Sequence, residues 1–428
     1  MVKKIINTKL CPILSAKIMS QSMENVPVIV QFNDSGSNLK KNINNLSNKV
    51  KSNLPLIDGF AGLMSTETIY RIVSSPEIEY ISFDSKIYTL LDIASPAMDA
   101  YFPHDKGYEG EGITVAVIDT GVAPHYDLTK PHNRIIGFKD IVNNKENPYD
   151  DNGHGTHVAG IIAGNGFSSN GKYTGIAPKA SILGIKALDE NGGGSTSDII
   201  AAISYIVETK DKYNTKVINL SLGTPANNTC DKDPLCKAVD KAIKAGLIVI
   251  TAAGNSGPEE GTILSPGINR NAITVGAVDD KRTIDTSDDT IAPFSSRGPT
   301  IEGLMKPDIV APGVNIKSLS NTKLDSYSSL SGTSMATPLV SGSVALLLNK
   351  HGNLSPQEIK DKITSSCIDL NESKANQGAG MLNLKSLFVD NFRDIEKNIP
   401  LNPMDSKGDF FESIIMILII LFLLDSRI

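Results

Sequence analysis

The chain has 428 residues, which is long enough for a large buried core and one accessory domain. Hydrophobic residues make up 40% and charged residues 21%, values near those of soluble globular proteins, which excludes disorder of the whole chain. Lys and Arg number 41 against 47 Asp and Glu, a net charge of -6, so nothing favours a nucleic acid or another polyanionic partner.

Residues 1–95 are predicted to form an N-terminal domain and its linker. Strands alternate with helices: a strand over Val26 to Phe32, a helix carrying Leu39, Ile43, Leu46, Val50 and Leu54, an extended segment over Ile57 to Met64, a short helix capped by Ser65, and a strand over Ile78 to Phe83. This order is typical of a small ferredoxin-like α+β domain. Tyr88 to Ser95 is predicted to be a linker.

Residues 96–390 are predicted to form a doubly wound α/β domain. Short runs that are apolar on both faces indicate buried parallel strands: Thr114 to Ile118, Ser181 to Lys186, Lys216 to Leu220, Leu247 to Ala253 and Ala272 to Val278. Crossover helices are expected over Ser197 to Glu208 and Leu235 to Ala245. In such a sheet, catalytic groups gather at the carboxyl ends of the strands.

Residues 391–428 are predicted to be a polar linker followed by an apolar tail. Ile414 to Leu424 are eleven consecutive apolar residues, fewer than the roughly 17 to 25 of a membrane span. Packing on the protein or contact with a membrane surface is therefore favoured over spanning. Near the start, Lys3 and Lys4 precede polar residues and Pro12 rather than a signal-peptide core. A cytoplasmic or cell-associated protein without a classical signal peptide is expected, with attachment to a membrane surface through the tail left open.

The four cysteines, Cys11, Cys230, Cys236 and Cys367, lack the spacing of metal ligands, so no zinc site is expected and no metal-ligating residue is named. Only Cys230 and Cys236 are close, and Pro234 between them indicates a loop. A local disulfide stays open, but free thiols in a reducing compartment are favoured for a chain so sparse in cysteine.

Three motifs lie at predicted ends of strands or helices. Asp119 ends the strand in Val115 to Gly121, His154 opens a helix in the glycine-rich stretch Asn152 to Gly160, and Ser334 lies near a helix start in Leu330 to Pro338. Taken singly, each suits a structural role as a turn former, a packed helix residue or an N-cap. His154 and His157 are three apart, but no third metal ligand stands near them.

Together the three motifs predict nucleophilic catalysis. A serine hydroxyl needs a base to remove its proton, and that base needs a carboxylate to fix its tautomer and offset its charge. The order Asp, His, Ser along the chain, with these motifs, resembles that of the subtilisin-like serine peptidases across about residues 97–387.

That resemblance implies roles for single residues. Asp119 would be the orienting acid, His154 the general base, Ser334 the nucleophile and His157 a structural residue. Asn255, in Val249 to Gly257, would donate to the oxyanion with the backbone N–H of Ser334. The segments Gly192-Gly193-Gly194-Ser195 and Ser221-Leu222-Gly223 would pair with the substrate main chain, and Ala252, Ala253 and Gly254 would line the pocket for the residue before the scissile bond.

The resemblance also implies a zymogen that hydrolyses polypeptides through an acyl-enzyme. The N-terminal domain would act as its inhibitor and be removed by self-cleavage between Asp84 and Ala97. No cofactor is required for catalysis. Calcium binding stays open, but no calcium site can be assigned, because Gly164 to Gly175 contains no Asp or Glu. Two alternatives remain: a maturation peptidase that cuts one precursor, and a catalytically inactive protein that holds peptides.

Overall fold

A computed structural model describes residues 9–11, 14, 25–33, 47, 49–84, 86–89, 98–281 and 286–389. All of these except Val389 belong to one compact unit, Met1–Phe388. The apolar tail Ile414 to Leu424 lies outside the described residues. Within the described ranges, no helix is both long enough and apolar enough to cross a membrane.

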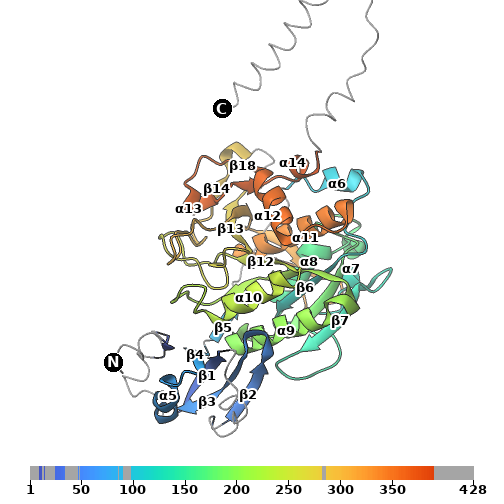
Figure 1. Ribbon diagram of the computed structural model, residues 1–428. Helices are drawn as coiled ribbons and strands as arrows, with labels where there is room; N and C mark the ends of the chain where they lie inside the picture. The colour runs from blue at the N-terminus through green and yellow to red at the C-terminus, as the bar shows by residue number, and fades with distance from the viewer. Residues whose placement is uncertain are drawn as a thin grey trace, which may run out of the picture. The chain divides into compact units, whose positions relative to one another are not determined.

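Four strands form the N-terminal sheet (Figure 1). They are β1 (Asn25–Phe32), β2 (Lys49–Leu54), β3 (Gly59–Ser65) and β4 (Ile78–Phe83), in the order β2-β3-β1-β4 with every pair antiparallel. Helix α5 (Thr66–Val73) begins as predicted at Ser65, whose side chain accepts a hydrogen bond from the Thr68 backbone N–H. This strand order is that of a ferredoxin-like fold.

Two sequence predictions for this region are wrong where the structure describes it. Val50 and Leu54 belong to β2 instead of a helix, because β2 pairs along its length with β3. The earlier part of that expected helix lies outside the described residues. Tyr88 and Thr89 are not a linker but part of β5 (Lys86–Thr89), which pairs on both sides with strands of the larger domain.

A ten-stranded sheet forms the centre of the larger domain in the described part of the chain. Its order is β18-β19-β15-β13-β12-β10-β6-β8-β7, with β14 paired to β13, and all pairs from β19 to β7 are parallel. The strands are β6 (Thr114–Asp119), β7 (Ile135–Asp140), β8 (Ser181–Lys186), β10 (Thr215–Leu220), β12 (Ile248–Ala252), β13 (Ile273–Asp279), β14 (Thr290–Ile291), β15 (Ile309–Pro312), β18 (Cys367–Ile368) and β19 (Met381–Leu382).

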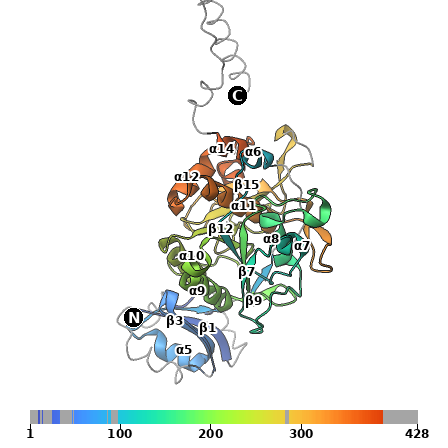
Figure 2. The ribbon, with the colours of Figure 1, turned by 90° about the vertical axis from the view of Figure 1, so that its right-hand side faces the viewer.

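Helices cover both faces of this sheet (Figure 2). Helices α8 (His154–Ala163) and α11 (Thr333–His351) pack in one core with one set of strand side chains, whereas α9 (Thr196–Tyr213) and α10 (Pro234–Lys244) pack in the other. The doubly wound α/β prediction is therefore confirmed. Shorter elements complete the domain: α6 (Tyr101–Asp105), α7 (Tyr126–Thr129), β9 (Gly193–Ser195), β11 (Leu222–Gly223), β16 (Ile316–Leu319), β17 (Tyr327–Leu330), α12 (Pro356–Ser365), α13 (Lys374–Gln377) and α14 (Leu384–Phe388), together with the 3-10 turns η1 (Pro55–Ile57), η2 (Phe167–Ser169) and η3 (Thr286–Asp288).

The N-terminal sheet packs against α9 and α10 (Figures 1 and 2). Ile29, Leu54, Ile57 and Ala61 share one apolar core with these helices. At the margin of this contact, Glu79 forms an ion pair with Lys237 of α10. Apolar burial thus joins the two parts of the compact unit.

Candidate active site

The closest contact between predicted site residues joins Asp119 and His154. Asp119 is the last residue of β6, and His154 is the first residue of α8. The Nδ1 atom of His154 lies 2.7 Å from Oδ1 of Asp119, and both side chains are fully buried. The same carboxylate oxygen accepts the backbone N–H of Thr120 at 2.7 Å. A buried carboxylate in this position fixes the imidazole tautomer that carries its proton on Nδ1, with Nε2 as the basic nitrogen.

Asp150, which sequence reasoning missed, holds the turn before His154. Its Oδ1 accepts the backbone N–H of Gly153 at 2.8 Å, and its Oδ2 accepts both the N–H and the hydroxyl of Thr156. Gly155 lets the turn approach β6, because a Cβ there would lie 2.1 Å from the carbonyl oxygen of Gly121. The position of the imidazole is thus set by the carboxylate of Asp150, which holds the turn, and by Gly155, which lets the turn lie close to the end of β6.

His157 is structural, as the resemblance implied. It is fully buried on α8, and its Nε2 donates to the carbonyl oxygen of Ile316 at 3.1 Å. Burial, helped by the nearby His154, lowers the pKa of His157 to about 3. The ring is therefore neutral at physiological pH.

Ser334 lies in the first turn of α11 and is hydrogen-bonded to Ser221, the residue that follows β10. Its hydroxyl donates to the carbonyl oxygen of Ser221 at 3.2 Å, and the Ser221 hydroxyl donates to the carbonyl oxygen of Ser334 at 2.9 Å. Ser221 follows β10, which is the parallel neighbour of β6. The sheet therefore brings Ser334 and the Asp119–His154 pair to the same edge.

Asn255 is oriented by Thr333, another residue that sequence reasoning missed. Its Oδ1 accepts both the backbone N–H and the hydroxyl of Thr333, each at 3.0 Å. Its Nδ2 end has no partner among the described residues, and neither does the backbone N–H of Ser334. Two donors thus remain near the serine, at the positive end of a helix dipole.

Two strand edges lie on either side of β5, and the space between these edges is called the groove below. β9 and β11 contain residues from the two glycine-rich segments named from the sequence, and β5 lies between them in a three-stranded antiparallel sheet. Tyr88 lies opposite both Gly193 and Gly223, and Thr89 lies opposite Leu222. Gly192 occupies the turn before β9 with a φ of 75°. The two edges are thus spaced to accept one strand between them.

Leu264, also missed from the sequence, lies between two of the named glycines. A Cβ added at Gly223 would lie 2.9 Å from the Leu264 Cβ, and one added at Gly254 would lie 2.6 Å from its Cγ. The backbone N–H of Leu264 donates to Ala253 at 2.9 Å. The leucine side chain therefore fills space beside Ala253 and Gly254 that the sequence suggested was open for substrate.

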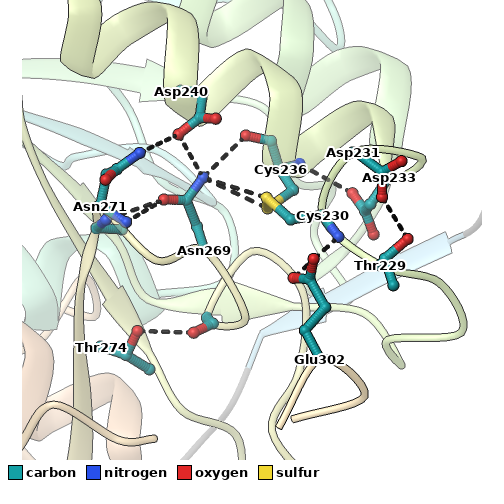
Figure 3. The surroundings of a disulfide bond; sticks show 12 residues. Thr229, Cys230, Asp231, Asp233, Cys236, Asp240, Asn269, Asn271, Thr274 and Glu302 are labelled. Carbon is teal, nitrogen blue, oxygen red and sulfur yellow. Dashed lines mark hydrogen bonds between the residues drawn. A yellow bond between two sulfur atoms is a disulfide. The ribbon is translucent and has the colours of Figure 1, made fainter. Parts of the chain in front are cut away.

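The favoured expectation of free thiols at Cys230 and Cys236 is wrong, because the two sulfurs form a disulfide (Figure 3). The Cα atoms lie 5.3 Å apart, inside the range that a disulfide spans. Pro234 is the first residue of α10, and Asp233 caps this helix, so the chain turns back between the two cysteines. Cys11 and Cys367 take no part in a disulfide.

The described residues include no group of three or more His, Cys, Asp or Glu side chains placed to hold a metal ion. The carboxylate that reaches the segment after α8 is Asp127, and it is already engaged. Its Oδ1 accepts the backbone N–H of Ser168 at 2.8 Å, and its Oδ2 accepts the Tyr327 hydroxyl at 2.7 Å. This segment does not fit a calcium site of the kind that carboxylates provide.

Comparison with known proteins identifies the family. The model of the subtilase family (Peptidase S8) matches residues 110–381. The chain belongs to the subtilase family. Serine protease AprX of Bacillus subtilis (strain 168) is 40% identical over 359 residues, which cover 79% of this subtilase and 80% of that protein. Subtilisin E of the same organism is 32% identical over 389 residues, which cover 87% of this subtilase and 93% of subtilisin E.

A solved structure supports the same fold. The crystal structure of fervidolysin from Fervidobacterium pennivorans, described as a keratinolytic enzyme related to subtilisin, superposes with a TM-score of 0.68 at 24% identity. The match covers 85% of this subtilase and 60% of the fervidolysin chain. With the family match, this subtilase is a serine endopeptidase that acts on polypeptides.

Proposed function

We propose that this subtilase hydrolyses peptide bonds with Asp119, His154 and Ser334 as its catalytic triad. The buried 2.7 Å contact between Asp119 and His154 is the observation that carries the proposal. The Ser334 oxygen attacks the substrate carbonyl carbon while its proton passes to Nε2 of His154. The imidazolium then protonates the leaving amine, and water hydrolyses the resulting acyl-enzyme by the same route. Besides the substrate and water, only side chains and backbone groups of the enzyme take part, with no cofactor.

The negative charge that develops on the carbonyl oxygen is stabilised by Asn255 and by the backbone N–H of Ser334. Support comes from the bonds that Thr333 makes to Oδ1 of Asn255, because they leave the Nδ2 end as the donor. A donor fixed before the reaction stabilises the oxyanion without further reorganisation.

The N-terminal domain is proposed to inhibit the enzyme until it is cut away. This proposal is supported by β5, which pairs with both edges of the groove where a substrate main chain would lie. Thr89 pairs with Leu222, so a chain that kept this register would bring residue 90 opposite Ser221, next to the nucleophile. Self-cleavage is therefore proposed at the bond after Leu90, inside the range from Asp84 to Ala97. Residues 90–97 lie outside the described residues.

Attachment to a membrane surface through Ile414 to Leu424, in a cytoplasmic or cell-associated enzyme, stays a proposal. It is tested by fractionating cells that express the full chain or a chain ending at residue 409. Equal amounts of both proteins in the membrane fraction would contradict it.

The proposed function is tested by expressing the full chain, the Ser334→Ala variant and the matched Ser331→Ala variant. A fluorophosphonate probe should label the wild type and Ser331→Ala but not Ser334→Ala. Folded wild-type protein that neither takes up the probe nor hydrolyses casein or peptides would contradict catalysis and favour a peptide-holding protein. Cleavage of one precursor with no digestion of casein would favour a dedicated maturation peptidase.

A further inference from the structure

The Cys230–Cys236 disulfide lies against a buried amide side chain, that of Asn269 (Figure 3). Cys236 and Asn269 are both completely buried. The Nδ2 group of Asn269 donates to the carbonyl oxygen of Cys236 at 3.1 Å and to Oδ1 of Asp240 at 3.0 Å, and it lies 3.4 and 3.5 Å from the two sulfurs. Its Oδ1 accepts backbone N–H groups of Asn271 and Ala272. Every polar atom of this side chain therefore has a partner.

Asn269 ends the segment of residues 263–269, called the wall below, which lies beside the chain that follows β11. Ser265 exchanges two backbone hydrogen bonds of 2.9 Å with Thr224, the residue after β11, and Leu264 donates to Ala253. The Leu264 side chain, which is 8% exposed, fills the space between Gly223 and Gly254. A shift of this wall would therefore move the leucine relative to the substrate.

The wall and the disulfide share a small apolar cluster that is separate from the two large cores of the domain. Its buried members are Cys236, Ala253, Ile263 and Ile268, with Ala226 and Cys230 packed against it. So few side chains provide little packing of their own. Besides its backbone bonds to Thr224 and Ala253 and the bond that Gly267 accepts from the Thr274 hydroxyl, the wall is therefore held by the Asn269 hydrogen bonds and by the disulfide behind it.

We propose that the Cys230–Cys236 disulfide and Asn269 are positioning groups that hold residues 263–269 and thereby set the shape of the pocket next to the scissile bond. This inference rests on the proposed function. Leu264 shortens this pocket. The pocket therefore accepts a substrate side chain of small or medium size, such as that of alanine or leucine, in preference to that of phenylalanine or lysine. Without the disulfide, the wall shifts and this preference is lost.

The disulfide is open to reduction by a small dithiol. Cys230 is partly exposed and lines a cavity of about 570 Å³ whose other walls include Phe32, Glu79 and Lys241. A thiolate of dithiothreitol attacks one sulfur and its second thiol releases the other, so that two electrons and two protons reduce the disulfide to two thiols and the reagent becomes a cyclic disulfide. Burial raises the pKa of Cys367 to about 12. The Cys367 thiol therefore stays protonated and does not attack the disulfide.

The bond is expected to affect the groove more than the stability of the whole molecule. The two cysteines lie 6 positions apart in the sequence, and a disulfide that closes so short a loop restricts the unfolded chain less than one that closes a long loop. A change in substrate preference with little change in melting temperature would thus distinguish positioning from a general structural role.

The test uses the full chain after self-processing, as wild type, as the Cys230→Ala/Cys236→Ala double variant and as the matched control Cys367→Ala. Values of kcat and KM are measured for four peptide nitroanilides that differ only in alanine, leucine, phenylalanine or lysine before the scissile bond. In the double variant, KM for the leucine peptide should rise by about 10-fold and the preference over phenylalanine should fall by a similar factor, with kcat changed less. Dithiothreitol should reproduce this change in the wild type and leave the double variant unaffected, while Cys367→Ala should match the wild type.

The Asn269→Ala variant should show the same direction of change with the disulfide intact. If the double variant does not fold, titration of the folded wild type with dithiothreitol gives the same measurement. Unchanged KM and unchanged preference after complete reduction, checked by thiol counting, would overturn the inference while the proposed function stands. A folded, processed wild type without activity on any peptide would overturn both.

Discussion

The carboxylate of Asp84 accepts both the backbone N–H and the hydroxyl of Ser197, at 3.0 and 2.6 Å. Asp84 follows β4 of the N-terminal domain, and Ser197 lies in the first turn of α9. An acid from one domain thus satisfies a helix N-terminus of the other, where free N–H groups and the helix dipole favour negative charge. Lys51 adds ion pairs to Asp84 at 3.5 Å and to Asp198 at 3.0 Å.

We expect Asp84→Ala to weaken the docking of the N-terminal domain by about 1–2 kcal/mol, the usual size of a lost helix cap. In the full chain, this loss should shorten the delay between refolding and the appearance of peptidase activity. The matched control is Glu67→Ala, because Glu67 is an exposed acid of the same domain. An Asp84→Ala chain that becomes active at the wild-type rate would show that this contact does not contribute to inhibition.

Self-cleavage should create a new N-terminus at Leu91. The register that pairs Thr89 with Leu222 predicts this bond, and mass spectrometry of the processed protein checks it. A Gly194→Val variant should process more slowly, because even a Cβ at Gly194 would lie 2.6 Å from the carbonyl oxygen of Ala187 and disturb β9. A single cut more than two residues away from this bond would mean that β5 does not lie in the register of a substrate.

Asp119→Asn is expected to lower kcat by about 10⁴-fold, because the amide favours the wrong imidazole tautomer. Asn255→Ala is expected to lower kcat by roughly 10² to 10³-fold with KM nearly unchanged, since the amide acts on charge that exists only in the transition state. Both are measured on one soluble peptide substrate. A fall in kcat/KM caused mainly by a higher KM would indicate that Asn255 binds the ground state instead.

The main features of the larger domain could be predicted because they depend on local patterns. Runs such as Val115 to Ile118 are apolar on both faces, and the glycines around His154 mark a tight turn, so strands and site residues follow from short stretches of chain. The exchange of hydrogen bonds between Ser221 and Ser334, by contrast, joins residues that are 113 positions apart. Contacts of this kind have no local signal.

The wrong predictions, of a linker at Tyr88, a helix at Val50 and free thiols at Cys230 and Cys236, also concern contacts that a local pattern does not show. β5 forms only because β9 and β11 offer free edges on both sides, and these edges are distant in sequence. Val50 and Leu54 fit the spacing of a helix, but pairing with β3 outweighs that pattern. The short spacing of Cys230 and Cys236 favours a disulfide once Pro234 is taken as the first residue of α10 instead of as part of a loop.

The last prediction concerns stability in acid and the buried His157. Its pKa is about 3 in the folded protein because of burial, whereas an unfolded chain has the ordinary value of 6.5. Between these values the unfolded state binds a proton that the folded state does not, so stability is full above pH 6.5 and falls as the pH falls toward 3. From pH 6.5 to pH 5 the loss from this residue is about 2 kcal/mol.

Urea unfolding of the Ser334→Ala protein, which avoids self-digestion, measures this loss at several pH values. In the Ser334→Ala protein, the free energy of unfolding should fall as the pH is lowered from 6.5 to 5. The added change His157→Gln should remove about 2 kcal/mol of this fall. His132→Gln, a change at an exposed histidine, should leave the slope of unfolding free energy against pH intact. Equal slopes for the His157→Gln protein and its parent would mean that His157 is protonated in the fold, and that burial does not keep its ring neutral.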